Sequence, residues 1–474
     1  MRERILRQVV RAAGLSALLA WPFAAGAKDL AVGPGREFAR IEEALAKAAA
    51  DDAILVYPRE GNAPYEKVAL FVDVERLAIR AVPGKDGQRV KLSGKGYDYS
   101  GRGRIPRAII QFNGHANGCT LDGFELFGAH NQSHNGAGVR IVFANDVTVR
   151  NCDIHGNDMG VMSNGDKTQK TAVNQLFEGC IIRENGDAAD PGYNHNLYLG
   201  GTSVTLRFCE VYGSLTGSNV KSRAHYNRIE YCYVHDSSNR EFDLVDAADT
   251  EALDSHAVLI GNVIVKDPAC KGNRAVIHFG QDGGKQHDGT LYLVHNTIVT
   301  PFITAVVDLS ASKAKAVLIG NIVTDGGGGP KNPTLVAGSR GGNAANAAGS
   351  HNWLYEGYRK SAGGTGLDLG TTTFGPRGTL PPFADLKGRD FHLSARAEGI
   401  TDAGLPVEQL DVPSGTAVPA VDHGPEARAT PADASTKTAE PEPLLKWQYK
   451  HPAAGEPRPN DGKPDLGAYE YAPK

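Results

Sequence analysis

Two short stretches of the chain combine cations, aromatic rings and histidines at close spacing. They are NHNLYLGG at residues 194–201 and SNVKSRAHYNRI at residues 218–229. Lys221 and Arg223 are two positions apart, so on a strand they would face the same way at a separation of about 7 Å. An arginine can bind a carboxylate bidentately, and a lysine beside another cation has a lowered pKa. The pair therefore predicts a site that holds a carboxylate and removes a nearby proton.

Further side chains that can donate, accept or bind surround this pair. Tyr198 and Lys221 each lie 11 residues before a cysteine, so on stacked coils they would be neighbours. The same alignment places Asp243 beside Lys221 and Glu241 beside Asn219 on the next coil. The candidate catalytic residues are Lys221, Arg223, Tyr198 and His195, and the candidate substrate-binding residues are Asp243, His225 and Glu241.

This set suits the cleavage of a uronic-acid polymer by elimination, in which the proton next to the carboxylate is removed and the glycosidic oxygen leaves. Arg223 would neutralise the carboxylate and so make that proton more acidic. Lys221 would act as the base, and Tyr198 or His195 would donate to the leaving oxygen. Asp243 opposes this scheme, because a carboxylate raises the pKa of a neighbouring lysine. The alternative for the cations is that they are solvated charges on a strand face.

Other titratable residues suggest different chemistry. Asp243, Asp246 and Asp249 are spaced by three in a predicted turn, which is typical of loop carboxylates or a weak cation site. They also leave open a glycoside hydrolase that uses paired carboxylates. His278 and His295 fall on separate coils without converging ligands, so no metal site is expected. We expect no cofactor.

The candidate residues are embedded in an internal repeat. Its strings are LDGFEL, VRNCDI, FEGCII, LRFCEV, IEYCYV, LIGNVI, LVHNTI and LIGNIV, and their fourth residues are spaced by 23 to 34 positions. Apolar and polar residues alternate within each unit, as at 147–149 and 204–206, which indicates short strands. Each unit has two or three of them. The pattern predicts a solenoid of stacked coils with long parallel sheets.

The fourth residues of these strings should form one interior column. In-register asparagines hydrogen-bond amide to amide, and in-register cysteines point in parallel rather than toward each other. We therefore expect reduced, buried thiols, with Cys119 and Cys270 outside the column. The column is Phe124, Cys152, Cys180, Cys209, Cys232, Asn262, Asn296 and Asn321.

Composition and the first residues set the protein class. The 474 residues include 57 glycines but 3 methionines and 3 tryptophans, with 41% hydrophobic and 22% charged residues, which favours a turn-rich β protein over a helical or disordered one. Residues 1–27 carry four arginines, an apolar run and the ending Ala25-Gly26-Ala27, the pattern of a secretory signal too short to span a bilayer. We expect an exported chain, periplasmic or extracellular, with no membrane span.

The remaining organisation follows from local patterns. We predict a signal peptide at 1–27, a β-helix domain at 28–340, and an irregular extension at 341–474 with a mobile Pro/Ala-rich stretch at 412–443. A helix within 37–50 would cap the first coil, and the alternating segment 465–471 would return to the solenoid. The net charge of −4 makes nucleic acid an unexpected partner. We expect a monomer.

Three motifs carry a resemblance. The opening VGPGREFARIEEALAKAAADDAILVYP is similar to the N-terminal cap of the right-handed parallel β-helix carbohydrate-active superfamily, which includes pectate lyases, pectin methylesterases, and chondroitinase B with the alginate lyases. FADLKGRDFHL, with the later ITDAG, resembles a late segment of bacterial members. The resemblance implies an all-β, right-handed parallel β-helix.

The chondroitinase B and alginate lyase family is distantly similar in a finer feature. Members have a lysine in a Lys-Ser context on one coil and an arginine on the following coil. Lys221 matches the lysine, whereas the next coil reads NREFDLVDAAD, with Arg240 near its start and Asp243 in the aligned position. The resemblance implies an exported lyase that acts on an anionic polysaccharide. A glycoside hydrolase on the same fold and a non-catalytic polysaccharide-binding surface protein remain the alternatives.

Overall fold

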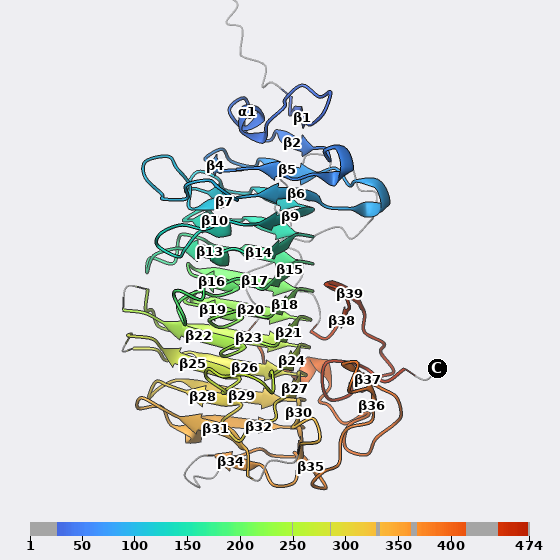
Figure 1. Cartoon of the computed structure of the whole chain (residues 1–474). Coiled ribbons are helices and arrows are strands. Elements are labelled where there is room, and N and C mark those ends of the chain that lie inside the picture. Colours follow the sequence, from blue (N-terminus) through green and yellow to red (C-terminus); the bar gives the residue numbers. More distant parts are fainter. Residues whose placement is uncertain are drawn as a thin grey trace, which may run out of the picture.

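Three strands in each coil build three parallel sheets along the length of the molecule (Figure 1). The computed structural model describes residues 26–248, 250–284, 286–328, 332–361, 367–413 and 444–472. Each coil passes from sheet C to sheet A to sheet B, as β7, β8 and β9 do. The predicted all-β parallel β-helix is therefore confirmed, with three strands per coil in the regular part of the stack. Most of the predicted signal peptide, and residues 414–443 of the predicted mobile stretch, lie outside the described residues.

The sheets are defined by their strands. Sheet A contains β1 (Asp29–Val32), β2 (Ala53–Val56), β5 (Ala78–Ala81), β8 (Thr120–Asp122), β11 (Thr148–Arg150), β14 (Gln175–Glu178), β17 (Ser203–Arg207), β20 (Tyr226–Glu230), β23 (His256–Ile260), β26 (Thr290–Val294), β29 (Lys315–Ile319) and β32 (Ala347–Ser350). Sheet B contains β3 (Tyr65–Glu66), β6 (Val90–Ser93), β9 (Phe124–Phe127), β12 (Asp153–His155), β15 (Ile181–Arg183), β18 (Glu210–Tyr212), β21 (Tyr233–His235), β24 (Val263–Val265), β27 (Thr297–Val299), β30 (Ile322–Thr324), β33 (Trp353–Tyr355) and β35 (Thr373–Gly375). Sheet C contains β4 (Leu70–Val72), β7 (Ala108–Phe112), β10 (Ala137–Val142), β13 (Met159–Asn164), β16 (Leu197–Leu199), β19 (Val220–Ser222), β22 (Phe242–Asp246), β25 (Ile277–Gln281), β28 (Val307–Leu309), β31 (Thr334–Gly338) and β34 (Arg359–Ser361).

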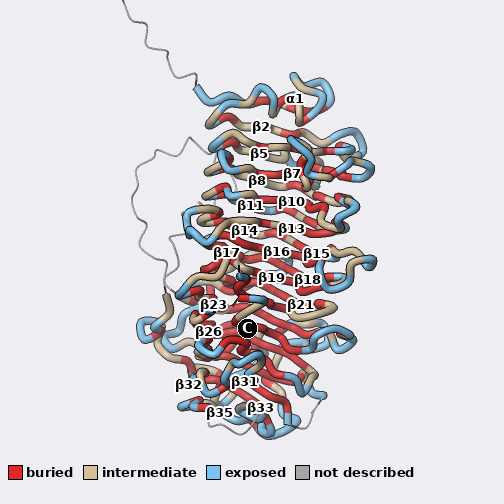
Figure 2. Tube along the Cα trace, turned by 90° about the vertical axis from the view of Figure 1, so that its left-hand side faces the viewer, coloured by how far each residue is buried: buried red, intermediate tan, exposed pale blue. Residues whose placement is uncertain are grey.

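Alternation along these strands creates the core. In β22, Phe242 and Leu244 are buried in the main apolar cluster, and the residue between them faces away from it. Buried residues follow the strands and exposed residues gather in the loops (Figure 2). The parallel coils continue to β35, so the predicted domain end at residue 340 falls inside the stack. The repeat phrase fades there, although Asn352 still continues the column of asparagines.

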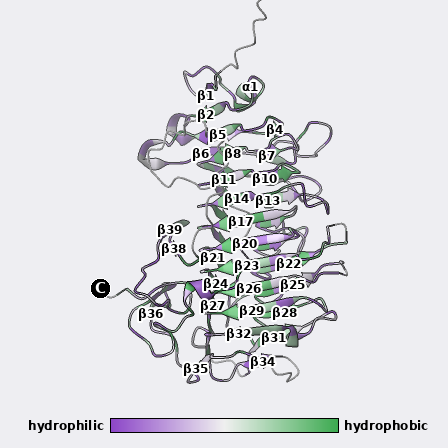
Figure 3. Ribbon diagram, turned by 180° about the vertical axis from the view of Figure 1, so that it is seen from behind, coloured by the Kyte–Doolittle hydropathy of each residue, from purple (hydrophilic) through white to green (hydrophobic). Residues whose placement is uncertain are grey.

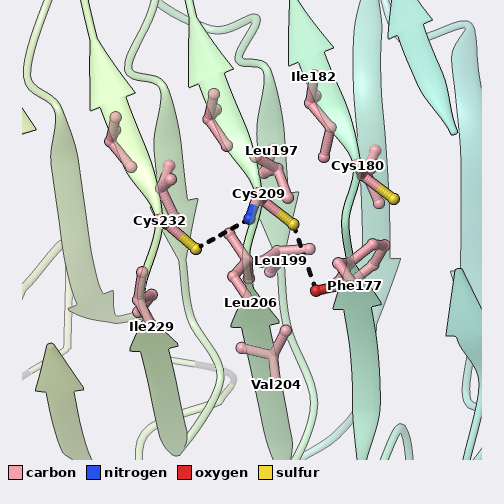
Figure 4. Close-up of a cluster of buried hydrophobic side chains, with 14 of the residues drawn as sticks. Phe177, Cys180, Ile182, Leu197, Leu199, Val204, Leu206, Cys209, Ile229 and Cys232 are labelled. Atoms are coloured by element: carbon pink, nitrogen blue, oxygen red, sulfur yellow. Dashed lines mark hydrogen bonds between the residues drawn. The ribbon is translucent and has the colours of Figure 1, made fainter. Parts of the chain in front are cut away.

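The predicted interior column lies at the turn from sheet A to sheet B. All six cysteines are free and buried, which confirms the expectation for the four in the column, and Figure 4 shows Cys180, Cys209 and Cys232 of that column. The amide of Cys209 donates to Cys232 Sγ at 3.4 Å, and the amide of Cys232 donates to Asn262 Oδ1 at 2.9 Å. Side-chain amide bonds of 2.9 to 3.0 Å then link Asn262, Asn296, Asn321 and Asn352.

A second polar ladder, which the sequence did not predict, fills the turn from sheet B to sheet C. Side-chain hydrogen bonds run from Asn157 through Asn185 and Asn196 to Asn219 at 2.8 to 3.0 Å. Asn219 Nδ2 then donates to Glu241 Oε2 at 2.6 Å. Glu241 Oε1 lies 3.5 Å from Lys266 Nζ, and both side chains are fully buried. The ladder thus satisfies buried amides in three successive turns and ends on an ion pair.

Other elements cover the first coil and pack against the outward faces of sheets A and B. Helix α1 (Ile41–Leu45) buries Ile41 and Ala44 at the first coil, so the predicted cap exists but is shorter than 37–50. The C-terminal part forms two antiparallel hairpins, β36 (Phe383–Asp385) with β37 (Asp390–Leu393) and β38 (Trp447–Lys450) with β39 (Ala454–Pro457). Segment 465–471 does return to the solenoid, where Gly467 N donates to Gly320 O, but without forming a strand. Short 3-10 turns occupy Glu60–Asn62, Lys85–Gly87, Ala344–Asn346 and Val407–Gln409. No helix in the described ranges is both long enough and apolar enough to cross a bilayer.

Candidate functional site

Four titratable side chains lie in register on the outward face of sheet C. Tyr198 of β16 pairs with Lys221 of β19, and Lys221 pairs with Asp243 of β22. Both alignments were predicted from the spacing to the cysteine column, and both are confirmed. Asp243 pairs in turn with His278 of β25. The strand pairing therefore sets these residues one strand spacing apart, about 4.8 Å each.

Lys221 is held between two carboxylates. Its Nζ lies 2.8 Å from Asp243 Oδ2 and 2.7 Å from Asp282 Oδ2. Arg223 Nη2 binds the same oxygen of Asp282 at 2.9 Å. Asp282 follows β25 directly, so the next coil but one supplies the carboxylate that joins the two cations. A single carboxylate oxygen thus accepts hydrogen bonds from both predicted catalytic cations.

These contacts change what was expected of Lys221. The residue is only 9% exposed, so it does not lie on a freely solvated strand face. Burial acts to lower the pKa of Lys221, but Asp243 and Asp282 outweigh it and the pKa is raised. The expectation that Arg223 lowers this pKa is therefore wrong, because Asp282 stands between the two cations. Lys221 carries its proton at neutral pH.

Asp243 forms a close contact with His278, which the sequence analysis considered only as a metal ligand. Its Oδ1 lies 2.6 Å from His278 Nδ1 and 3.7 Å from Arg240 Nη1. Burial acts to raise the pKa of Asp243, but the hydrogen bond with His278 and the charge of Lys221 hold it far below its usual range. His278 lies 18 residues before Asn296, much as Asp243 lies 19 before Asn262, so the spacing could have found it.

Tyr198 and His195 form the other side of the cluster. The centroid of the Tyr198 ring lies 5.4 Å from Arg223 Cζ and 6.0 Å from Lys221 Nζ. His195 packs edge-on against Tyr198 at 5.3 Å between ring centroids, and its Nδ1 accepts from the Ser218 amide at 3.0 Å. Burial, followed by the charge of Lys221, lowers the pKa of His195 to about 3. His195 is therefore neutral, with its proton on Nε2, and its ring packs against the ring of Tyr198.

Two predicted binding residues do not face the cluster. Glu241 was expected on the outward face beside Asn219, but it is fully buried and ends the polar ladder between Asn219 and Lys266. The prediction was wrong because the chain turns at this position, which directs the side chain into the corner. His225 is 4% exposed, with Nδ1 3.5 Å from Ser255 Oγ, at the turn from sheet C to sheet A.

Asp246 is a buried carboxyl at the corresponding turn of the next coil, where β22 ends. It is 1% exposed, and its Oδ2 has no hydrogen-bond partner in the described residues. Burial, followed by the charge of Glu251, raises the pKa of Asp246 to about 7. Of the three aspartates spaced by three, Asp249 lies outside the described residues. No group of three metal-binding side chains converges in the described ranges, and His295 instead contacts the carbonyl of Asp465 at 2.8 Å.

The described C-terminal segment leaves the outward face of sheet C uncovered. Figures 1 and 3 show the two hairpins beside sheet B, on the side of the stack away from β22, β25 and β28. The long loop at 185–194 reaches another loop of this face, because His134 Nδ1 lies 2.7 Å from Asp187 Oδ2. Two loops of this face therefore contact each other beside the coils that carry the cluster.

Comparisons with known proteins add little. No protein-family model matches the chain, and no curated protein matches it. One similar solved structure is titled "Crystal structure of pectate lyase Pel9A", with 13% identity and a TM-score of 0.42 over 94% of this chain and 96% of that one. Another is "Pectin methylesterase PemA from Erwinia chrysanthemi", with 9% identity and a TM-score of 0.30 over 72% of this chain and 92% of that one. At these scores neither carries an argument, and the fold rests on this chain's own strand pairing. The finer likeness to the chondroitinase B and alginate lyase family stays a prediction.

Proposed function

We propose that the outward face of sheet C binds an anionic polysaccharide and cleaves it by β-elimination. The carboxylate of Asp282 carries this proposal, since one of its oxygens is bound by Lys221 at 2.7 Å and by Arg223 at 2.9 Å beside the ring of Tyr198. Such a cluster is complementary to a carboxylate. Asp282 has a side chain 36% exposed and belongs to a loop, so it can yield this place to the carboxylate of a uronic acid.

Arg223, Lys221 and Tyr198 can divide the steps of elimination among them. Arg223 would neutralise the substrate carboxylate, which makes the proton on the adjacent carbon more acidic. Lys221, once deprotonated, would take that proton. The electron pair forms the new carbon–carbon double bond, and the bond to the glycosidic oxygen breaks. The hydroxyl of Tyr198 would protonate that leaving oxygen.

Lys221 must lose its proton before it can act as a base. Two carboxylates raise its pKa, and exchange of Asp282 for a substrate carboxylate does not remove the negative charge. Elimination should therefore speed up as the pH rises above neutrality. Burial of Lys221 acts in the opposite direction and favours loss of the proton.

A hydrolase is the second candidate, and Asp246 is the observation that favours it. A glycosidase needs one protonated carboxyl as acid and one ionised carboxylate. Asp243 and Asp282 both have lowered pKa values, so neither suits the acid role. Asp246 has a pKa of about 7, but it is buried at the corner rather than in the outward row. We therefore place elimination first.

Incubation with a panel of uronate polymers separates the three functions. The products are followed by the ultraviolet absorbance of an unsaturated uronate and by the number of new reducing ends. A lyase produces both signals, a hydrolase produces reducing ends alone, and a binding protein retains the polymer without shortening it. We expect both signals, with an increase toward alkaline pH. Asp246→Asn should leave them intact, and its loss of all cleavage would favour the hydrolase.

We also propose that the protein is exported. The predicted leader ends before Lys28, and its removal can be checked on protein recovered from the periplasm or the medium. The mass of the first peptide should begin at or near Lys28.

A further inference from the structure

A second cation lies in the same outward row of sheet C, three strands before Lys221. Arg140 of β10 pairs with Met162 of β13, which pairs with Tyr198 and so leads to Lys221. Three strand spacings correspond to about 14 Å. Arg140 is 9% exposed, so its charge is largely removed from water.

Arg140 differs from the cations of the Lys221 cluster in its partners. Its Nη2 donates to Asn164 Oδ1 at 2.9 Å and its Nη1 to Met162 Sδ at 3.1 Å. Across the described residues, no carboxylate forms an ion pair with it. A guanidinium has five N–H groups, so most of its capacity for a planar anion is unused. Lys221 and Arg223, in contrast, each contact an aspartate.

A second arginine adds to the positive charge. Burial, followed by repulsion from Arg107, lowers the pKa of Arg140 to about 10, so it remains charged at neutral pH. A largely buried charge without a counter-ion is costly to a fold. An anion bound from outside would remove that cost. The same anion would use the hydrogens that Arg140 does not donate to the protein.

The surface between the two cationic places suits a sugar chain. Met162 and Tyr198 are half-buried there and pack on a small apolar cluster of Ala108, Ala137 and Met159, which is separate from the main core. Apolar and aromatic side chains of this kind provide a floor for the faces of sugar rings. A polymer that lies along the stack would cross this floor on its way from Arg140 to Lys221.

We propose that Arg140, with Arg107 beside it, is a second carboxylate-binding subsite for the same anionic polysaccharide, several sugars away from the reacting bond. This inference rests on the proposed function for the substrate class alone. It requires a polymer with repeated carboxylates. It also predicts that the length of the ligand decides whether Arg140 contributes.

Calorimetric binding of uronate oligomers tests the subsite without reference to cleavage. The probes are a disaccharide, which fits the Lys221 cluster alone, a hexasaccharide, and the same hexasaccharide with its carboxyl groups reduced to alcohols. Arg140→Gln should weaken the charged hexasaccharide about 10- to 100-fold, as expected for loss of a charge-assisted contact, and should leave the disaccharide unchanged. Wild-type protein should bind the reduced hexasaccharide as weakly as the variant does or more weakly.

Two further variants control for charge and fold. Arg150→Gln removes the same charge from sheet A, where Arg150 pairs with Asp122 at 2.9 Å, and should leave all affinities unchanged. Arg140→Lys keeps the charge without the planar fork and should recover part of the hexasaccharide affinity. Unchanged hexasaccharide binding by Arg140→Gln would overturn the subsite, and so would an equal loss for the disaccharide. Wild type that binds the hexasaccharide without cleaving it would refute the lyase and leave the subsite standing.

Discussion

The outward faces of sheets B and C belong to the same coils but have opposite character. On sheet B, Tyr233, Val263, Val265 and Val299 face outward, and residues of the C-terminal hairpins and segment 465–471 bury them. On sheet C, the corresponding coils present Lys221, Asp243 and His278, which pair with one another. The hairpins stand on the sheet B side (Figure 3).

The chemical character of an outward row of side chains indicates whether another segment covers it. An apolar outward column would be a large exposed patch if nothing covered it, so it predicts a docked segment. A charged column that no described segment covers must instead satisfy its own charges, as Lys221 does through Asp243 and Asp282. Arg140 forms no such ion pair with a carboxylate in the described ranges, which is why we assign it an external partner.

The largest effect should come from removing the central cation of sheet C. Lys221→Ala should lower turnover of a uronate polymer about 10²- to 10⁴-fold, the usual contribution of a positioned base. It should also destabilise the protein, since Asp243 loses a buried partner. Lys315→Ala, at an exposed position on sheet A, is the control and should change neither quantity. Near-normal turnover by a folded Lys221→Ala variant would remove sheet C as the reactive face.

On the sheet B side the expected loss is one of stability rather than activity. Tyr449 is 2% exposed, packs against Tyr233 with the two rings tilted, and donates to Glu210 Oε2 at 3.2 Å. Tyr449→Ala should lower the free energy of unfolding by about 3–5 kcal/mol, as for other large aromatic truncations. Denaturant titration measures this loss, and Lys450→Ala next to it should stay within about 0.5 kcal/mol of wild type. If turnover at low temperature fell as well, the two faces would not be independent.

Asp282 gives a test of the sheet C site through the pH dependence of the reaction. Its carboxylate helps to raise the pKa of Lys221, so Asp282→Asn should lower that pKa. A base must be deprotonated, and the rising limb of the pH–rate profile should therefore move to lower pH. A profile of kcat/KM against pH, which reports the free enzyme in which Asp282 holds Lys221, measures the shift for wild type and variant. A limb that stays in place would show that another group takes the proton.

The smallest effect is expected where a hairpin meets sheet B through charge. Arg389 Nη2 binds Asp236 Oδ1 at 2.9 Å. Burial acts to raise the pKa of Asp236, but His235 and Arg389 outweigh it and the pKa is well below its ordinary value. This contribution is present above the unfolded pKa of about 3.9 and is lost as the pH falls through the folded value. Asp236→Asn should cost about 1 kcal/mol at neutral pH, and the difference from wild type should vanish in strong acid.

The parts of the fold and site that the sequence predicted depend on the repeat. The period placed Cys209 and Cys232 in one column, and the same count placed Tyr198, Lys221 and Asp243 in one row. Both follow from the fixed register of parallel strands. The prediction that Glu241 faces outward was wrong because Glu241 lies at a turn just before β22, where side chains no longer alternate between the two faces of a strand.

Residues supplied by loops could not be counted from the repeat. Asp282 lies just past β25, and its approach to Lys221, 61 positions earlier, depends on the path of a loop. The raised pKa of Asp246 likewise depends on Glu251, which a loop brings near. In the described ranges, no carboxylate pairs with Arg140, and this depends on how several separate segments pack around it. Contacts of this kind depend on the tertiary structure and cannot be derived from the repeat.

The column of free thiols also constrains the order of events during biogenesis. In an unfolded chain a cysteine has a pKa of about 8.5 and reacts readily with oxidants. Once the coils stack, burial raises the pKa of Cys152, Cys180 and Cys209 well above its usual value, and the reactive thiolate becomes rare. A disulfide made too early would join side chains that the finished column holds parallel. In an oxidising compartment, the yield of native protein therefore depends on whether the coils assemble faster than the thiols are oxidised. Once the coils have assembled, burial protects the thiols from oxidation.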